Sequence, residues 1–459
     1  MRIFQHHILF PLLLLACAEA GALAASPLIA AQLLHTQFHS PLAATADLAV
    51  FAVVTLLGLV AMGLYSRRQR TRILGVVVRS AAAVLAGIAA VAFMSYGVPA
   101  LFMSRAALGL GAVIALVLTG VVRIVFDRAV TDDIFKRRVL VYGAGRRAIG
   151  ISQLRRRTDQ RGFVIQSFIR LEDERPVVPA DRIVSLDRPL LEYCREREID
   201  EIVIAMDDRR RAFPVHELLE CRLNGVEIID IVDFLERETG KVRLDVLNPS
   251  WIIFSPGFDR SRWREFSKRS FDIAASVGLL LISWPFMLIA LVAILIEDGW
   301  RAPVLYRQRR IGLDNQPFDV LKFRSMRIDA EQPGTAVWAQ KQDPRVTRVG
   351  SFIRKVRIDE LPQIVNVLYG DMSFVGPRPE RPEFVAELEN RIPYYRERHC
   401  VKPGITGWAQ LCYPYGSSEQ DAAEKLQYDL FYVKNHSMLF DLMILLQTAE
   451  VVLWGQGAR

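Results

Sequence analysis

The sequence predicts a three-part membrane protein: an N-terminal α-helical bundle of four membrane spans, a Rossmann-like α/β middle domain, and a mainly α-helical C-terminal domain with a re-entrant membrane helix. Four apolar runs fall within 1–128, and a glycine turn among strand-like runs follows within 137–250. A fifth apolar run, 272–296, lies near the start of the last part, 265–459. With 51% hydrophobic residues the composition is unlike that of a soluble enzyme, and 459 residues leave room for two or three domains.

Each of the four N-terminal apolar runs is roughly long enough to cross a bilayer core. They cover 8–25, 46–66, 74–95 and 106–126. The first run has a second interpretation, because Ala22, Ala24 and Ala25 offer a cleavage site for a signal peptidase. Since only Arg2 contributes positive charge before it, a retained span is favoured over a cleaved signal.

Positive charge between the runs predicts their orientation. The segment 26–45 has no Lys or Arg. Four arginines without an acid follow the second run: Arg67, Arg68, Arg70 and Arg72. Because positively charged loops stay in the cytoplasm, two further spans return the chain to the cytoplasm at about residue 127.

Charge and cysteine content argue against a nucleic-acid-binding protein and against a zinc-binding protein. The net charge is +8, but much of the excess lies beside apolar segments, so membrane lipid and not nucleic acid is the expected partner. The five cysteines show no zinc-ligand spacing, and four of them lie in parts predicted to be cytoplasmic. We therefore expect free thiols.

The middle part opens with "RRVLVYGAGRRAIG" (137–150), which is typical of a buried strand that runs into a glycine turn and a helix. The strand-like runs "FVIQSFI" and "EIVIAM" follow and alternate with helical stretches, as expected of a Rossmann-like domain. Three residues match the dinucleotide fingerprint: Gly143, Gly145 and Ala148.

The sequence leaves two interpretations of this turn. Arg146 and Arg147 make it attractive to phosphate. However, the acid expected after the second strand is not clear, since Arg170 ends that strand and Glu172 and Asp173 come later. The domain is either a working nucleotide site or, as we favour, a vestigial or regulatory domain that helps the protein to form a homodimer.

The run 272–296 is long enough to cross a bilayer, because about 24 helical residues span about 36 Å. Yet Ser283 and Pro285 lie near its middle, where proline breaks or kinks a helix. Both flanks are basic: Arg264, Lys268 and Arg269 before the run, and Arg301, Arg307, Arg309 and Arg310 after it. A straight crossing would place one basic flank outside, so we expect a re-entrant helix–break–helix in which Ser283 satisfies freed backbone groups. The alternative is a kinked transmembrane helix.

Three blocks of the C-terminal part resemble the bacterial sugar transferase family, the polyprenyl-phosphate phosphoglycosyltransferases. They are "YRQRRIGLDNQPFDVLKFRSM" (306–326), "DPRVTRVGSFIRKVRIDELPQIVNVLYGDMSFVGPRPE" (343–380) and "VKPGITGWAQ" (401–410). The four spans and the Rossmann-like domain look like those of the large members of this family. The resemblance therefore extends, more weakly, over nearly the whole chain.

The resemblance implies an enzyme that transfers a sugar-1-phosphate from a UDP-sugar to undecaprenyl phosphate and releases UMP. The family works at the cytoplasmic face of the bacterial inner membrane, in the first membrane step of exopolysaccharide or related glycan synthesis. No motif identifies the sugar. Two rival hypotheses remain: a membrane-tethered nucleotide-sensing or scaffold protein, and an NAD-dependent nucleotide-sugar oxidoreductase or epimerase, which has only the glycine turn in its favour.

The segment "RIDELPQ" (357–363) offers two neighbouring carboxylates for phosphoryl transfer. Asp359 is the candidate nucleophile, which would form an aspartyl phosphate, and nearby cations are expected to keep it ionised. Glu360 is the candidate ligand of Mg²⁺, since that ion often takes only one or two protein carboxylates. The resemblance assigns the same roles to these two positions.

Cations from three blocks are the candidate phosphate ligands. They are Lys322, Arg324, Arg357 and Arg378. Arginine binds phosphate through two parallel hydrogen bonds, which suits Arg378 to a diphosphate. The alternative for each cation is a solvated charge or a structural ion pair. His399 and His436 are not needed by this chemistry.

Overall fold

The structure is a computed structural model. It describes residues 2–3, 6–7, 10–35, 41–61, 64–65, 73–97, 105–131, 136–152, 154, 162–171, 174–208, 213–247, 249–255, 261–327, 345–413, 416 and 418–454. The chain divides into two compact units, Met1–Val246 and Leu247–Arg459. Arg67–Arg72, on which the predicted orientation depends, lie outside the described residues.

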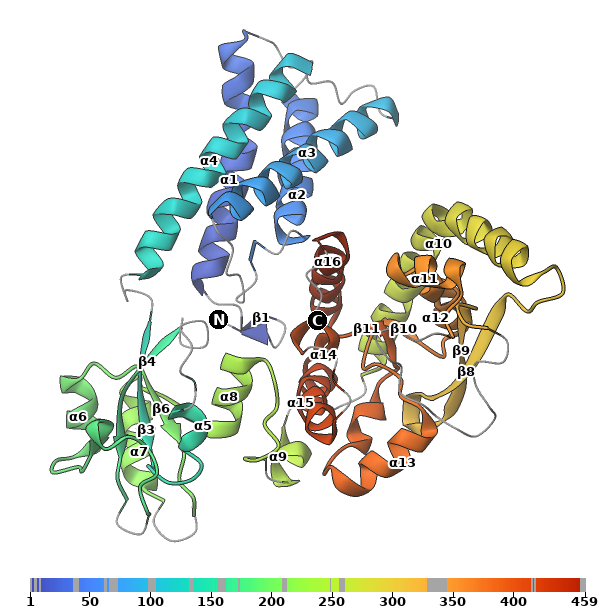
Figure 1. The fold of residues 1–459 in the computed structure, drawn as a ribbon. Coiled ribbons are helices and arrows are strands. Elements are labelled where there is room, and N and C mark those ends of the chain that lie inside the picture. The colour runs from blue at the N-terminus through green and yellow to red at the C-terminus, as the bar shows by residue number, and fades with distance from the viewer. Residues whose placement is uncertain are drawn as a thin grey trace. The chain divides into compact units, whose positions relative to one another are not determined.

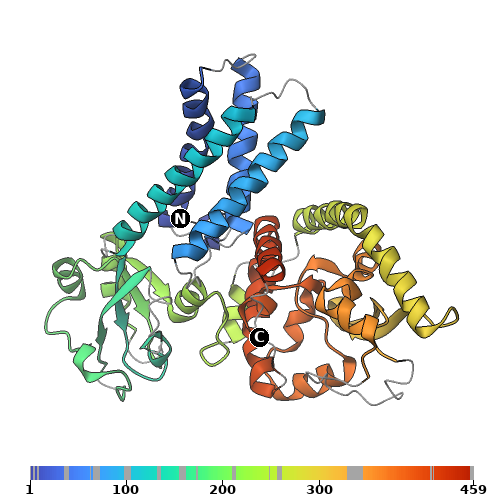
Figure 2. The ribbon, with the colours of Figure 1, turned by 45° about the horizontal axis from the view of Figure 1, so that its top comes forward.

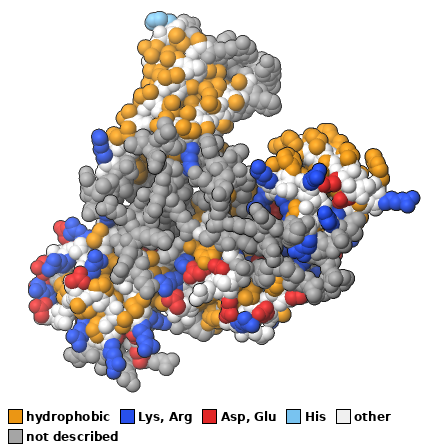
Figure 3. Space-filling model, in the orientation of Figure 1, with side chains coloured by type: hydrophobic (Ala, Val, Ile, Leu, Met, Phe, Trp, Pro, Cys, Tyr) orange, Lys and Arg blue, Asp and Glu red, His pale blue; other side chains and the backbone are white. Residues whose placement is uncertain are grey.

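The first unit begins with apolar helices, as predicted. After a short antiparallel pair (β1, Arg2–Ile3; β2, His6–His7) come α1 (Phe10–Leu33), α2 (Pro41–Ala61), α3 (Ile73–Gly97) and α4 (Arg105–Thr131). The helices pack α1 against α4 and α2, and α3 against α2 and α4 (Figure 1). Hydrophobic side chains are spread over the part of this bundle that Figure 3 colours by type.

The four N-terminal helices differ in the length of their apolar parts. Within the described residues, Leu14–Leu33 and Ala106–Phe126 are long and apolar enough to cross a membrane, whereas the apolar parts of α2 and α3, Leu48–Val60 and Val76–Ala89, are shorter. A third long apolar helix, Arg262–Asp298, belongs to the second unit.

A buried ion pair ties α1 to α4 inside this apolar bundle. Arg123 Nε lies 2.6 Å from Glu19 Oε1, and Glu19 is fully buried. Arg123 Nη1 also donates to the backbone oxygen of Leu64 (3.0 Å), and the Tyr65 hydroxyl donates to Glu19. Since a lone charge in an apolar bundle is costly, mutual pairing explains why both residues are tolerated there.

The middle domain contains a five-stranded parallel sheet, which confirms the predicted α/β class. The strands are β3 (Arg137–Tyr142), β4 (Phe163–Ile169), β5 (Ile183–Val184), β6 (Glu201–Ile204) and β7 (Glu227–Asp230), in the order β5-β4-β3-β6-β7. This is the Rossmann order, with its switch point between β3 and β6. Four α-helices and a 3₁₀ turn accompany the sheet: α5 (Ile149–Ser152), η1 (Ala180–Arg182), α6 (Leu190–Glu196), α7 (Val215–Leu223) and α8 (Ile231–Thr239).

The second unit opens with α9 (Pro249–Phe254) and the long α10 (Arg262–Asp298). Pro285 lies inside α10, and the helix bends sharply, which Figures 1 and 2 show from two directions. Helical structure continues through Ser283 and Pro285, so the expected interruption is a bend within one helix. The expected role of Ser283 differs as well, because its hydroxyl contacts Met287 Sδ (3.8 Å) and not a freed backbone group.

The remaining elements build a small mixed domain beside α10. An antiparallel hairpin of β8 (Leu305–Ile311) and β9 (Pro317–Phe323) encloses η2 (Leu313–Asn315), and β10 (Ser373–Val375) pairs in parallel with β11 (Gly404–Thr406). The other helices are α11 (Arg348–Lys355), η3 (Ile358–Glu360), α12 (Gln363–Tyr369), α13 (Pro382–Arg391), η4 (Arg396–Cys400), α14 (Trp408–Cys412), α15 (Glu419–Asn435) and α16 (Met438–Trp454). Helices dominate, as predicted, but the two strand pairs carry parts of the site.

The base of α10 is fastened to β10 by buried polar groups. Lys268 Nζ donates to the Val375 carbonyl (3.0 Å) and lies 2.6 Å from Asp441 Oδ2. One turn later, Asp272 accepts hydrogen bonds from the Ser373 hydroxyl (2.9 Å) and the Phe374 N–H (3.1 Å). These contacts link the apolar helix to the strand that precedes Arg378.

Candidate active site

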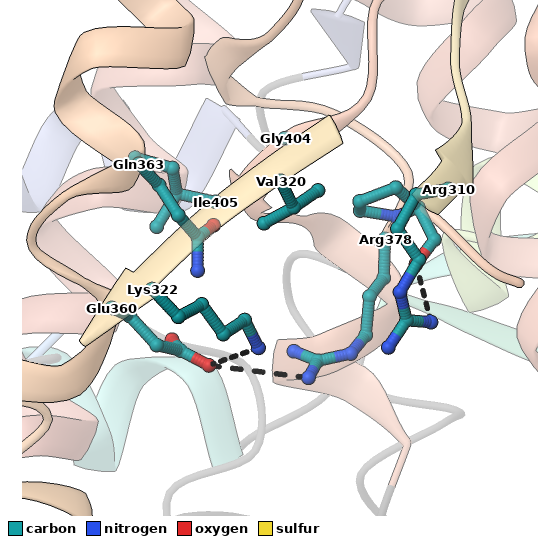
Figure 4. A pocket seen from close by; sticks show the side chains of 9 residues that line it. Arg310, Val320, Lys322, Glu360, Gln363, Arg378, Gly404 and Ile405 are labelled. Atoms are coloured by element: carbon teal, nitrogen blue, oxygen red, sulfur yellow. Dashed lines mark hydrogen bonds and ion pairs between the residues drawn. The ribbon is translucent and has the colours of Figure 1, made fainter. Parts of the chain in front are cut away.

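Charged side chains from separate blocks of the sequence meet around one open cavity in the second unit. The lining residues are Arg310, Val320, Lys322, Glu360, Gln363, Arg378, Pro379, Gly404 and Ile405. Figure 4 shows the side chains of Lys322 and Arg378 directed toward Glu360. Three of the residues predicted from the sequence therefore line one cavity.

The hairpin places Lys322 and Arg310 on one face. Side chains alternate along a strand, so Val320 and Lys322 of β9 point the same way. Arg310 of β8 stands opposite Phe318, which is two residues before Val320 and shares its face. The hairpin thus turns two cations from neighbouring strands toward the cavity.

Glu360 ends the 3₁₀ turn η3, which follows a left-handed residue. Arg357 has a φ of 61°, which is unusual for a residue with a Cβ and lets the chain reverse between α11 and η3. Its side chain is 66% exposed. Asp359 is the buried residue of η3, with 8% exposure, whereas Glu360 faces the cavity. The two carboxylates therefore point in different directions.

Three cations share the carboxylate of Glu360. Its Oε1 atom lies 3.7 Å from Lys322 Nζ, 3.7 Å from Arg357 Nη1 and 4.0 Å from Arg378 Nη2. These separations exceed the length of a hydrogen bond, so the attraction to Glu360 is electrostatic. A cavity with more positive than negative groups is suited to a phosphate or diphosphate.

The electrostatics differ between the two carboxylates. Burial opposes ionisation of Glu360, but Arg378, Lys322 and Arg357 together hold its pKa below the usual value. Burial raises the pKa of Asp359, and Glu360 raises it further, against Lys322, Arg354 and Arg357. We expected nearby cations to favour the ionised form of Asp359, and they do lower its pKa, but burial and the neighbouring Glu360 outweigh them. Burial also lowers the pKa of Lys322, an effect that Glu360 opposes.

The other predicted residues lie beside the cavity and not in its lining. Asp359 Oδ1 is buried and has no hydrogen-bond partner among the described residues. Arg324 follows the end of β9; its N–H donates to the Val304 carbonyl (2.8 Å), and its buried Nε has no partner within the described structure. These positions place Asp359 next to Glu360 but leave Arg324 without a visible link to phosphate.

Sequence reasoning missed two residues of the cavity, and it expected only a turn at Gly404, where two strands approach closely. Arg310 was considered only as part of a basic flank, and Gln363, a buried amide that follows "DELP", was not singled out. Gly404 permits close approach of β11 to β10, because a Cβ there would lie 2.1 Å from Gly376 N. The register of the hairpin and of β10 with β11 brings these residues together, and neither register is visible in a single motif.

The donor set around Glu360 fits a magnesium ion that is shared with a substrate. Mg²⁺ usually takes one or two protein carboxylates and completes its shell with phosphate oxygens and water. In the described parts of the chain, no group of three or more His, Cys, Asp or Glu could hold a metal ion. Glu360, the carboxylate that lines the cavity, matches the smaller set and not an all-protein cage.

The glycine turn of the middle domain is filled by the protein's own carboxylates. Asp207, which follows β6 across the switch point, accepts hydrogen bonds from the N–H groups of Arg146 and Arg147, each at 2.9 Å. Glu174 accepts from the Ala144 N–H (3.0 Å) and the Asp207 N–H (2.7 Å). The backbone donors that would bind a phosphate in a dinucleotide site already have anionic partners.

Packing within the protein explains why small residues occupy the three fingerprint positions. Gly143 has a φ of +119°, and a Cβ there would lie 2.8 Å from the backbone carbon of Ala205. A Cβ at Gly145 would lie 2.3 Å from Asp207 Oδ2, and Ala148 is fully buried. The helix that follows, α5, has only four residues. Close packing at the switch point accounts for this pattern without a ligand.

Comparisons with known proteins place the C-terminal unit in a family. A model described as "Bacterial sugar transferase" matches residues 263–455, and one described as "CoA-binding domain" matches 60–229. The exopolysaccharide production protein PSS of Rhizobium leguminosarum bv. phaseoli is 40% identical over 186 residues, which are 39% of this chain and 92% of that protein. The chain belongs to the bacterial sugar transferase family, as its three blocks predicted.

Two longer relatives extend the similarity toward the middle domain. The UDP-N-acetylgalactosamine-undecaprenyl-phosphate N-acetylgalactosaminephosphotransferase of Aeromonas hydrophila is 42% identical over 278 residues, 60% of this chain and 63% of that protein. The UDP-glucose:undecaprenyl-phosphate glucose-1-phosphate transferase of Xanthomonas campestris pv. campestris is 36% identical over 273 residues, 58% of this chain and 55% of that protein. The matched regions therefore cover little more than half of these two relatives.

Proposed function

We propose that this chain is a phosphoglycosyltransferase that moves a sugar-1-phosphate from a UDP-sugar to undecaprenyl phosphate. The observation that carries the proposal is the cavity where Lys322 and Arg378 face Glu360 beside the buried Asp359. Phosphoryl transfer needs cations that neutralise charge on phosphate oxygens and a nucleophile in line with the leaving group. The names of the relatives from Aeromonas and Xanthomonas describe such a transfer and support the same reaction here.

In the first half-reaction we assign the nucleophile to Asp359. A carboxylate oxygen attacks the phosphorus that bears the sugar, and the bond from this phosphorus to the oxygen shared with UMP breaks. The electron pair leaves with UMP, and an aspartyl phosphate that carries the sugar remains. Arg378 and Lys322 contribute by holding the phosphate oxygens, while the burial of Asp359 excludes water from the acyl phosphate.

In the second half-reaction the phosphate of undecaprenyl phosphate attacks the same phosphorus. The bond to Asp359 breaks, the carboxylate is restored, and the lipid diphosphate sugar is released. This would be the first membrane step of exopolysaccharide or related glycan synthesis. The matches to transferases of N-acetylgalactosamine phosphate and of glucose phosphate make both UDP-sugars candidate donors.

A magnesium ion held by Glu360 would neutralise charge on the diphosphate of the donor. Chelation of divalent ions is therefore expected to stop UMP release. Glu360→Gln should lower turnover about a thousandfold, since a metal ion contributes several kcal/mol at the transition state. Raised Mg²⁺ should restore part of this loss. Turnover that survives both chelation and Glu360→Gln would contradict the metal assignment.

We further propose that α1–α4 cross the bacterial inner membrane and that α10 enters the membrane and returns to the cytoplasmic side. The basic flanks of α10, the proline inside it and its bend support this path. Exposed apolar side chains surround the bend: Leu281, Ile282, Trp284, Phe286, Leu288 and Ile289. Cysteines placed just before 270 and just after 300 should both react from the cytoplasmic side only, and labelling from opposite sides would exclude a re-entrant helix.

The activity is tested with purified membranes supplied with undecaprenyl phosphate and a panel of UDP-sugars. We expect Mg²⁺-dependent release of UMP with at least one donor, and the panel identifies the sugar. Absence of UMP with every donor would contradict the proposed activity and leave the nucleotide-sensing or scaffold hypothesis. Formation of a homodimer by the middle domain stays a prediction, which the mass of the purified protein in detergent tests separately.

A further inference from the structure

The backbone that carries Arg378 is held at successive carbonyl groups although it has no regular secondary structure. It follows β10 and precedes α13. Pro377 O accepts from Gly404 N–H (2.9 Å), Arg378 O from Arg398 Nη2 (3.0 Å), Pro379 O from Arg310 Nη1 (3.1 Å), and Glu380 O from Ile311 N–H (2.9 Å). Two of these four donors are cationic side chains.

Arg398 joins three separate parts of the domain. It belongs to η4 and is 5% exposed. One terminal nitrogen, Nη2, donates to Arg378 O and lies 2.8 Å from Asp429 Oδ2 on α15; the other, Nη1, donates to the Tyr395 hydroxyl (2.6 Å). The planar guanidinium can serve all three acceptors at once, which a lysine ammonium on a flexible stem cannot reproduce.

Stability alone does not explain this arrangement. Taking an arginine and an aspartate out of water is costly, and buried ion pairs are frequently no better for stability than apolar residues of similar volume. Asp429 is 2% exposed, so both charges of the pair pay this desolvation. Burial raises the pKa of Asp429, and Arg398 opposes this rise by favouring the ionised carboxylate. The contact that distinguishes this pair is the hydrogen bond to the backbone of Arg378.

We propose that Arg398, charge-paired with Asp429, is a positioning residue that fixes the backbone of Arg378 so that its guanidinium meets the diphosphate of the nucleotide-sugar donor. The inference rests on the proposed function, in which Arg378 binds that diphosphate. The Arg378 side chain is 37% exposed, and its Nη2 atom lies 4.0 Å from Glu360 Oε1. The position of the Arg378 backbone sets the point from which the guanidinium reaches the cavity, and Arg398 holds that backbone through the Arg378 carbonyl.

The test is a double-mutant cycle in the full chain in lipid nanodiscs, read out as the Kd of UDP by calorimetry and as the KM of the UDP-sugar. Arg398→Lys keeps the charge but loses the three-way bridge, and we expect it to weaken UDP binding about tenfold. In an Arg378→Ala background, the same substitution should change the Kd less than about twofold, because Arg398 acts through Arg378. Equal effects of Arg398→Lys in both backgrounds, or none in either, would overturn the proposal.

A matched control separates positioning from loss of stability. Arg269 also donates to two backbone carbonyls, those of Val367 and Leu368, both at 2.6 Å, but these lie on α12. Arg269→Lys should lower the melting temperature without coupling to Arg378→Ala. If Arg398→Lys does not fold, Tyr395→Phe removes only the hydroxyl that Arg398 contacts and should show a weaker effect with the same coupling.

The two hypotheses fail in different ways. A wild-type protein that binds UDP and shows the coupling but releases no UMP would refute the proposed activity and leave the positioning role standing. A wild-type protein that releases UMP while Arg398→Lys leaves the UDP affinity unchanged would refute the positioning role alone. A wild-type protein that binds no UDP would overturn both.

Discussion

The glycine turn after β3 and the cavity beside β9 both gather groups that bind phosphate, but their donors are satisfied differently. In the glycine turn, the N–H groups of Arg146 and Arg147 each meet an oxygen of Asp207 at 2.9 Å, which is full hydrogen-bond contact. In the cavity, three cations share one oxygen of Glu360 at 3.7 to 4.0 Å. The first set of donors is hydrogen-bonded to a carboxylate of the protein, whereas the second set meets its carboxylate only at distances beyond hydrogen-bond length.

This difference shows that donors alone do not define a phosphate site. A turn whose N–H groups could bind a dinucleotide has only a structural role when a carboxylate that follows a neighbouring strand accepts hydrogen bonds from those N–H groups. Asp207 lies at the switch point of the sheet, where a ligand of a Rossmann-like domain would bind. The match of the middle region to a CoA-binding domain is therefore compatible with a shared fold whose phosphate-binding turn is closed in this chain.

The largest expected contrast comes from removing one arginine at each place. Arg378→Ala takes away a cation that faces the cavity and should lower kcat/KM for the UDP-sugar about a hundredfold or more. Arg146→Ala, in the glycine turn, should leave kcat/KM within about twofold, because the contact to Asp207 uses the Arg146 backbone. Steady-state UMP release measures both variants. Similar losses in the two variants would mean that the middle domain also binds substrate.

A second contrast concerns the closed turn itself. Asp207→Asn removes the charge and turns one acceptor into a donor that faces a backbone N–H, so we expect a loss of about 1–3 kcal/mol in stability and a lower melting temperature, with turnover unchanged. Millimolar CoA, ATP or NAD should not raise the melting temperature of the wild-type protein. Asp208→Asn, at the next residue, is the control. Stabilisation of the wild type by one of these nucleotides, lost in a variant of Gly145, would show that the turn is open.

The smallest predicted effect is on acid stability. Burial, followed by Arg398 and Arg396, lowers the pKa of His399 to about 3. The unfolded chain takes up a proton near pH 6.5, whereas the folded protein does not, so stability falls as the pH drops between about 6.5 and about 3. For one proton the slope is at most about 1.4 kcal/mol per pH unit. Between about pH 7 and about pH 5, the melting temperature of the His399→Gln variant should therefore fall less than that of the wild type. An equal loss would mean that His399 is protonated in the folded state.

Local patterns predicted much of the fold and part of the site. Apolar runs predicted α1–α4, and the run into Gly143 predicted β3 and the α/β class, because both depend on hydrophobic periodicity. The blocks around Lys322, Glu360 and Arg378 predicted residues that meet at one cavity. The family resemblance predicted that these residues form one site. Their spacing did not, since 38 positions separate Lys322 from Glu360.

Long-range partners could not be predicted. Asp207 lies about 60 residues from the turn that it closes, and no local pattern pairs a carboxylate with a distant backbone N–H. For the same reason the burial that raises the pKa of Asp359 could not be predicted, because the residues that cover its side chain are distant in the sequence. The contacts of Ser283 and the role of Arg310 likewise depend on packing that appears only once the chain is folded.

Asp359 is proposed to carry the sugar phosphate between the two half-reactions. This proposal is tested most directly by mass spectrometry of the protein quenched with a UDP-sugar in the absence of undecaprenyl phosphate. We expect an added sugar phosphate on the peptide that contains Asp359, one UMP released for each adduct, and neither with Asp359→Asn. Turnover of Asp359→Asn near the wild-type rate, with no adduct on the wild-type peptide, would contradict the claim and favour direct attack by the lipid phosphate.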